Sequence, residues 1–128
     1  KMEQGCSFFL TQPIYSDADV ERIADLKART GAKIIGGIMP LVSRKNALFI
    51  ANEMPGMHVP QEVLDCYKEG MSREEYEEVA IHVSVEIARK LTDIVDGYYF
   101  MTPFNRVGLI CNIIERVREE GLSGYAKE

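Results

Sequence analysis

The chain has 128 residues, of which 46% are hydrophobic and 27% charged, and its formal net charge at pH 7 is −5. This length suits a single domain whose core needs no disulfides. The acidic balance argues against nucleic acid as a partner, and no apolar run approaches the roughly 20 residues that span a bilayer.

The N-terminal residues lack the apolar centre of a signal peptide, so we expect a cytoplasmic protein. The three cysteines, Cys6, Cys66 and Cys111, are far apart, odd in number and form no CxxC pair. They share no ligand spacing with His58 or His82. We therefore expect reduced thiols in the core or just beneath the surface, and no structural metal site.

The first predicted strand is the apolar run Phe8–Leu10, which ends abruptly in Thr11 and Gln12, and Pro13 then stops any further pairing. Because the run has no polar side, it suits a strand that is covered on both faces, as in a parallel sheet. Gln12 then lies at the strand end where barrels and open parallel sheets bind ligands. Its amide has one acceptor and two donors, enough to bind the amide-like edge of a heterocycle. Alternatively, Gln12 only satisfies backbone groups of the loop.

A capping box at Ser16–Asp19 predicts a helix, which Thr30-Gly31 ends. The second strand is predicted over residues 33–38, where Gly36 and Gly37 are adjacent. Two glycines near a strand end indicate close approach of a neighbouring backbone or a ligand, or simply tight packing against neighbouring strands.

Three helices are predicted after the second strand. Ser43 begins one that runs to about Met54, and Pro60 opens a short one that ends before Gly70. A second capping box at Ser72 begins the longest. Its apolar stripe steps by three and four residues through Tyr76, Val79, Ala80, Val83, Ile87, Leu91 and Ile94.

Glu78, His82 and Glu86 lie on the opposite face of that helix. Two carboxylates beside a histidine would suit acid–base chemistry. Charge pairing between residues four apart on a solvated face explains the same pattern without any catalytic role, and we favour that interpretation.

A turn at Asp96-Gly97 leads into a third predicted strand, Tyr98–Met101, which Thr102-Pro103 ends. Asn105-Arg106 then introduces a final helix that Gly121 closes. The predicted buried face of this helix consists of Val107, Ile110, Ile114 and Val117.

Strands that alternate with helices predict an α/β fold with parallel strands and right-handed crossovers. Because a proline follows the end of each strand, Gln12, Met39 and Asn105-Arg106 should converge on one face of the sheet. Three parallel strands leave both edges unpaired and apolar flanks uncovered. Either the chain is a piece of a larger sheet, which we favour, or copies associate to complete one.

Short motifs occur in an order that resembles the C-terminal part of a methylenetetrahydrofolate reductase: Thr11-Gln12, Gly37–Pro40, Val59-Pro60 and Asn105-Arg106. Two further stretches, Pro40–Ala47 and Asn52–Gly56, resemble the form that is fused to a homocysteine S-methyltransferase domain. The resemblance covers about Gly5 to Val117.

The resemblance implies a TIM (β/α)8 barrel, of which residues 1–128 would be a C-terminal fragment holding the last three parallel strands and their flanking helices. Members of the family reduce 5,10-methylenetetrahydrofolate to 5-methyltetrahydrofolate, passing hydride from NAD(P)H through FAD. The family's acidic proton donor and most flavin contacts belong to earlier strands, so the fragment would be inactive alone. Its partners would be the folate substrate, the rest of the barrel or an upstream methyltransferase domain, and other copies of itself. NADH and NADPH both stay open as reductants.

By resemblance, Gln12 contacts the pterin ring of the folate or, in the other half-reaction, the nicotinamide. Arg106 lies near the aminobenzoyl-glutamate tail, where a guanidinium suits a carboxylate. The chain departs from the family at two ligand positions. Ala47, with Asn46 beside it, stands where some members have a glutamine, and Ala51, with Phe49 nearby, where some have a phenylalanine.

Two other interpretations stay open. The chain could be a self-associating α/β module whose Gly36-Gly37 and Asn105-Arg106 loops bind phosphate or another anion without catalysis. Alternatively, the barrel could host a different flavin- or phosphate-dependent reaction, since this fold supports many.

Overall fold

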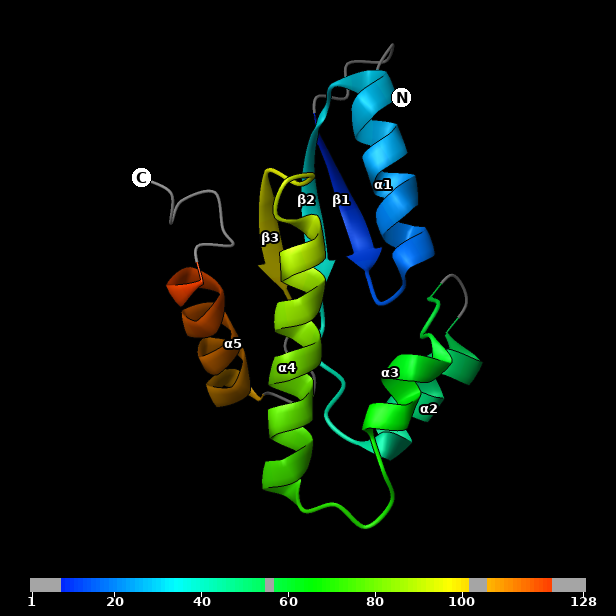
Figure 1. Ribbon diagram of the computed structural model, residues 1–128, viewed down its shortest axis with the longest axis vertical. Helices are drawn as coiled ribbons and strands as arrows, with labels where there is room; N and C mark the ends of the chain where they lie inside the picture. Colours follow the sequence, from blue (N-terminus) through cyan, green and yellow to red (C-terminus); the bar gives the residue numbers. More distant parts are fainter. Residues whose placement is uncertain (1–7, 55–56, 102–105, 121–128) are drawn as a thin grey trace.

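The computed structural model describes residues 8–54, 57–101 and 106–120. Its elements alternate as predicted (Figure 1): β1 (Phe8–Pro13), α1 (Asp17–Thr30), β2 (Lys33–Ile38), α2 (Arg44–Glu53), α3 (Gln61–Cys66), α4 (Arg73–Leu91), β3 (Gly97–Phe100) and α5 (Val107–Glu119). The stop signals at Thr102-Pro103 and residue Asn105 lie outside the described residues. Within those residues, no helix is long and apolar enough to cross a membrane.

The three strands form one parallel sheet in the order β1-β2-β3, as expected. Their arrows point the same way in Figure 1, toward the end of the molecule where α2, α3 and the first turns of α4 lie. All carboxyl ends of the strands therefore meet at one edge of the sheet, which is where a ligand site is expected in this class of fold.

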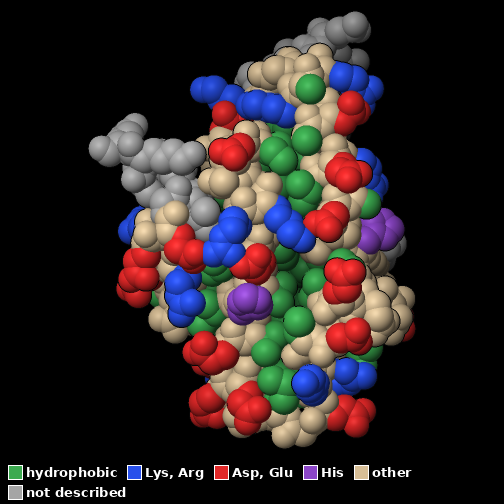
Figure 2. Space-filling view, in the orientation of Figure 1, with side chains coloured by type: hydrophobic (Ala, Val, Ile, Leu, Met, Phe, Trp, Pro, Cys, Tyr) green, Lys and Arg blue, Asp and Glu red, His purple; other side chains and the backbone are tan. Residues whose placement is uncertain are grey.

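Helices cover one face of the sheet. In Figure 1, α4 lies over the sheet and α1 lies beside it, and both contribute to one core with β2. Ile34 is fully buried between the sheet and these helices. Charged side chains of both signs are scattered over the outer surface of this helix layer, with apolar atoms showing between the helices (Figure 2).

The other face of the sheet is open, which contradicts the expectation that β1 is covered on both faces. The side chains of Phe8 and Leu10 are 55% and 62% exposed. Both project from the face opposite to buried Ile34, because Leu10 pairs with Ile35, the next residue along β2. The prediction failed because the elements present supply only one covering layer, which agrees with the separate expectation of an incomplete sheet.

Serine caps begin the main helices as predicted. The hydroxyl oxygens of Ser16, Ser43 and Ser72 accept hydrogen bonds from the backbone N–H three residues later, at 3.1 to 3.2 Å. Gly31 ends α1 with φ of 65°, a left-handed conformation that glycine adopts without strain.

An ion pair joins α1 to the turn before β3 and fixes the amino end of β2. Lys27 Nζ lies 2.7 Å from Asp96 Oδ2 and donates to the carbonyl of Ala32 at 2.9 Å. Asp96 Oδ2 also accepts from the backbone N–H of Ile34 at 2.8 Å. The lysine and this N–H lower the pKa of Asp96, because both stabilise the carboxylate.

The buried face of α5 differs from the predicted one. Leu109, Ile110, Ile113 and Val117 are buried, whereas Val107 is 62% exposed and Ile114 is only partly buried. The helix is thus turned about its axis relative to the predicted stripe: Ile113 and Val117 belong to the core that α4 shares, and Ile114 and Val107 do not.

The cysteine prediction was also wrong where the structure tests it. Cys66 and Cys111 are exposed free thiols, and Cys6 lies outside the described residues. Cys66 lies at the last position of the short helix α3, and Cys111 lies on the outer side of α5, so neither helix directs its cysteine into the core.

Candidate functional site at the carboxyl end of the sheet

The end of β1 contains an irregularity at the residues singled out from the sequence. Leu10 pairs with Ile35, but the next paired residue, Pro13, faces Gly37. Three steps along β1 therefore match two steps along β2, so one extra residue is accommodated at Thr11-Gln12. Such β-bulges occur next to active sites, where they change the direction of a side chain.

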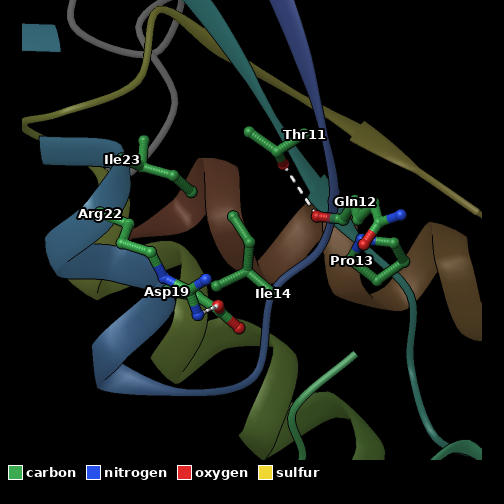
Figure 3. Close-up of a pocket in the computed structure, with 7 residues that line it drawn as sticks. All are labelled: Thr11, Gln12, Pro13, Ile14, Asp19, Arg22 and Ile23. Atoms are coloured by element: carbon green, nitrogen blue, oxygen red, sulfur yellow. Dashed lines mark hydrogen bonds and ion pairs between the residues drawn. The ribbon is translucent and has the colours of Figure 1, made fainter. Parts of the chain in front are cut away.

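The side chain of Thr11 replaces part of the regular ladder at this bulge. Its Oγ1 accepts the backbone N–H of Gly37 at 2.8 Å and donates to the carbonyl of Gln12 at 2.9 Å. The second bond is drawn in Figure 3. Beyond the bulge the N–H of Ile14 donates to the carbonyl of Gly37 at 3.2 Å, so the pairing of β1 with β2 resumes after Pro13.

Gln12 is exposed at the bulge, as expected for a residue that meets a ligand. It lines an open hollow of about 220 Å³ that also includes Thr11, Pro13, Ile14, Ile23, Asp19 and Arg22. In Figure 3 the Gln12 side chain extends away from Asp19 and Arg22, which pair with each other at 2.5 Å. The arginine is thus neutralised by its own helix neighbour, while the amide of Gln12 remains accessible.

Tyr99 crosses from β3 to the bulge. Its hydroxyl donates to the backbone carbonyl of Thr11, the residue before Gln12. On the way the ring passes over Gly37, where a Cβ would lie 2.9 Å from the Tyr99 hydroxyl and 3.0 Å from the Thr11 carbonyl oxygen. Gly37 therefore gives the tyrosine its space. Burial raises the pKa of Tyr99, so its hydroxyl keeps its proton at neutral pH.

The neighbouring glycine is explained by packing on the other face. A Cβ at Gly36 would lie 3.3 Å from Val95 Cγ1 and 3.4 Å from Leu91 Cδ1. Both structural interpretations of the glycine pair are therefore found, one at each residue: Gly36 packs tightly under the end of α4, and Gly37 is closely approached by the Thr11 backbone and by Tyr99.

Arg106 lies at the start of α5, and its side chain is directed to α4. Its Nη2 is 2.5 Å from Glu77 Oε1, and the side chain is only 14% exposed. Arg73 approaches the same carboxylate oxygen, with its Nε at 3.7 Å. Glu77 therefore holds the guanidinium, but one bond leaves capacity for a ligand, because a guanidinium has five N–H donors.

Gln12 lies at the carboxyl end of β1, and Arg106 follows β3 in the sequence, at the start of α5. Met39 follows β2 at the same edge, where its carbonyl accepts the hydroxyl of Tyr15 at 2.9 Å. Gln12 and Met39 therefore lie at this edge, whereas the Arg106 side chain is engaged by Glu77 of α4, so its predicted convergence with Gln12 stays a prediction.

Ala47 and Ala51, the two positions at which the resemblance implies a departure from the family pattern, lie on α2. Asn46 Oδ1 accepts the backbone N–H of Val42 at 3.1 Å, and Ala47 is fully buried. Phe49 is exposed and lines a second hollow with Ser43, Lys45 and Asn46. Ala51 is partly buried.

Sequence reasoning missed Tyr99 and Glu77. The alternation of side chains along a strand indicates that Tyr99 faces away from Tyr98, whose hydroxyl donates to Ala88 of α4, but nothing local shows what Tyr99 meets. Glu77 reads as one more charge on a solvated helix face, like Glu78 and His82, which are indeed exposed.

Comparison with known proteins identifies the family. The family model for methylenetetrahydrofolate reductase matches residues 1–118. A search of curated proteins found no match. The match covers β1 through most of α5, including the bulge and Arg106. The chain therefore belongs to the methylenetetrahydrofolate reductase family.

Proposed function

We propose that this chain forms part of the substrate-binding wall of a reductase that converts 5,10-methylenetetrahydrofolate to 5-methyltetrahydrofolate with NAD(P)H as reductant and FAD as carrier. Family membership supports the reaction. The observation that carries the assignment to this part of the chain is Gln12, an exposed amide on a β-bulge at the carboxyl edge of a parallel sheet.

In this proposal the three strands belong to a TIM (β/α)8 barrel. The open face of the sheet, with Phe8 and Leu10 exposed, supports this because a barrel interior would cover it with side chains of further strands. The same segment could be preceded by a homocysteine S-methyltransferase domain, and the whole enzyme could be a homo-oligomer in the cytoplasm.

Within the wall, Gln12 would bind the pterin ring of the folate and the nicotinamide in alternate half-reactions. Its amide both donates and accepts, so it matches the mixed pattern of donors and acceptors on both rings. Arg106 would bind a carboxylate of the folate tail with the donors that Glu77 leaves available.

FAD, when bound, supplies a two-electron carrier between the nicotinamide and the folate. The described residues do not provide a site for its phosphates. Of the arginines that follow the ends of β1 and β3, Arg22 is paired with Asp19, and Arg106 is assigned in this proposal to the folate tail, so neither is left for the FAD phosphates. We therefore assign the flavin to the remainder of the barrel, and we expect the chain to be inactive alone.

The test compares this chain with a longer protein that includes the coding sequence upstream of it. The longer protein should bind FAD stoichiometrically and oxidise NAD(P)H with methylenetetrahydrofolate as acceptor, and the 128-residue chain should do neither. In the longer protein, Gln12→Glu should weaken folate binding because a carboxylate only accepts hydrogen bonds. Unchanged folate affinity would remove Gln12 from the site, and stoichiometric FAD with reductase activity in the short chain would refute its inactivity.

A second candidate function follows from the same open face. Copies of the chain could pair over their exposed apolar faces or along the free edge of β1 and act as a module that binds phosphate or another anion. This alternative predicts a defined oligomer by analytical ultracentrifugation and saturable phosphate binding by the chain alone. A monomeric chain without phosphate affinity would exclude it.

A further inference from the structure

The bulge at Thr11-Gln12 is held from a strand that is not its neighbour. Tyr99 belongs to β3, yet its hydroxyl donates to the carbonyl of Thr11 on β1, with β2 lying between the two strands. That carbonyl belongs to the peptide that joins Thr11 to Gln12. A bond at this peptide restricts the backbone rotation that decides where the Gln12 amide is directed.

A second bond acts on the other side of the same residue. Thr11 Oγ1 donates to the Gln12 carbonyl at 2.9 Å while it accepts the N–H of Gly37. The peptides before and after Gln12 are therefore both held, one by Tyr99 and one by Thr11. The Gln12 side chain itself is exposed, so its position depends on this backbone arrangement.

We infer that Tyr99 is a positioning residue for Gln12: its hydroxyl fixes the bulge so that the Gln12 amide is presented to the bound ring. This inference rests on the proposed function of Gln12. Tyr99 takes no part in hydride or proton transfer, and burial keeps its hydroxyl protonated and able to donate. Gly37 belongs to the same arrangement, because any side chain there would displace the tyrosine ring.

The test uses Tyr99→Phe in the longer, flavin-containing protein, with Tyr98→Phe as the matched control. Both changes remove one hydroxyl from adjacent residues of β3, and the hydroxyl of Tyr98 donates to Ala88 of α4 at 2.7 Å, on the opposite face of the sheet. Tyr99→Phe should raise the KM for methylenetetrahydrofolate about three- to tenfold, the range of one lost hydrogen bond, with kcat changed less than twofold. Tyr98→Phe should leave both constants unchanged.

A double mutant separates positioning from a general structural effect. If Tyr99 acts through Gln12, then adding Tyr99→Phe to a Gln12→Ala protein should raise the folate KM no further. Gly37→Ala should reproduce the KM change of Tyr99→Phe. Amide hydrogen exchange gives a readout that needs no folate: exchange at the Gly37 N–H, which donates to Thr11 Oγ1, should be faster in Tyr99→Phe than in Tyr98→Phe.

The outcomes are distinguishable. If Gln12→Ala raises the folate KM but Tyr99→Phe does not, the inference is wrong and the proposed function stands. If Tyr99→Phe raises the KM equally in the Gln12→Ala background, Tyr99 acts independently and the inference is again wrong. If Gln12→Ala leaves the KM unchanged, the role proposed for Gln12 fails, and the inference fails with it.

Discussion

Two buried tyrosines offer a test of how this core handles a polar group. Tyr15 and Tyr67 are both almost completely buried. The hydroxyl of Tyr15 donates to the Met39 carbonyl at 2.9 Å, whereas the hydroxyl of Tyr67 has no hydrogen-bond partner in the part of the chain that the structure describes. Removing the two hydroxyls should therefore change stability in opposite directions.

The magnitudes follow from the cost of burying an unsatisfied donor. Leaving a buried hydroxyl unpaired costs about 1–3 kcal/mol, and a satisfied hydrogen bond contributes about 0.5–1.5 kcal/mol net. Tyr67→Phe should raise the free energy of unfolding by about 1 kcal/mol or more, because the ring and its stacking on Tyr76, at 6.3 Å between centroids, are kept. Tyr15→Phe should lower it by about 1 kcal/mol, since the Met39 carbonyl then loses its donor.

Urea unfolding followed by circular dichroism measures both variants. The midpoints should move in opposite directions while the m-value stays constant, because neither change alters the surface exposed on unfolding. For a domain of this size a change of 1 kcal/mol shifts the melting temperature by about 4 °C. If Tyr67→Phe destabilised the chain as much as Tyr15→Phe does, the Tyr67 hydroxyl would have a partner and the reasoning would be refuted.

Three further measurements test other parts of the structure. Lys27 and the Ile34 N–H lower the pKa of Asp96. The contribution of Asp96 to stability should therefore be present above pH 4 and be lost as the pH falls through the lowered pKa. Asp96→Asn should lower the free energy of unfolding by about 1 kcal/mol at pH 7 and flatten the acid side of the stability curve. Burial raises the pKa of Tyr98 to about 12. The stability that this tyrosine contributes should therefore be complete below pH 10 and decline as the pH rises toward 12. Urea titrations at alkaline pH should show a smaller decline for Tyr98→Phe than for the unchanged chain. In the longer protein, Arg106→Ala should raise the folate KM more than it lowers kcat. Glu77→Gln should lower the folate KM, because it removes the carboxylate that competes for Arg106. A raised KM in Glu77→Gln would show that Glu77 orients the arginine instead.

Local signals in the sequence predicted most of the fold. The serines at the helix starts and the glycine after α1 act within a few residues of themselves, so they can be read without knowing the tertiary structure. The prediction that Pro13 stops pairing was wrong, because Pro13 is the last residue of β1 and Ile14 still bonds to Gly37. Parallel pairing followed from the alternation of strands and helices, and β2 was predicted with the bounds that the structure gives it.

What could not be predicted depends on residues far apart in the sequence. Tyr99 meets Thr11 across 88 positions, and Arg106 meets Glu77 across 29. The exposure of Val107 depends on which side of α5 meets α4, a property of the packed pair rather than of either helix alone. The sequence identified Gln12 and Arg106 as candidates, but only the structure shows the bulge beneath the first and the carboxylate that holds the second.

The bare side of the sheet makes tolerance to substitution depend on the length of chain in which it is measured. Leu10→Lys and Phe8→Lys place charges on side chains that are already mostly in water here, so they should improve the solubility of the 128-residue chain at little cost. In the proposed barrel the same lysines would be enclosed among apolar neighbours and would prevent assembly. If the proposed barrel is correct, a mutational survey of this chain alone would score as harmless some of the positions that the barrel needs most.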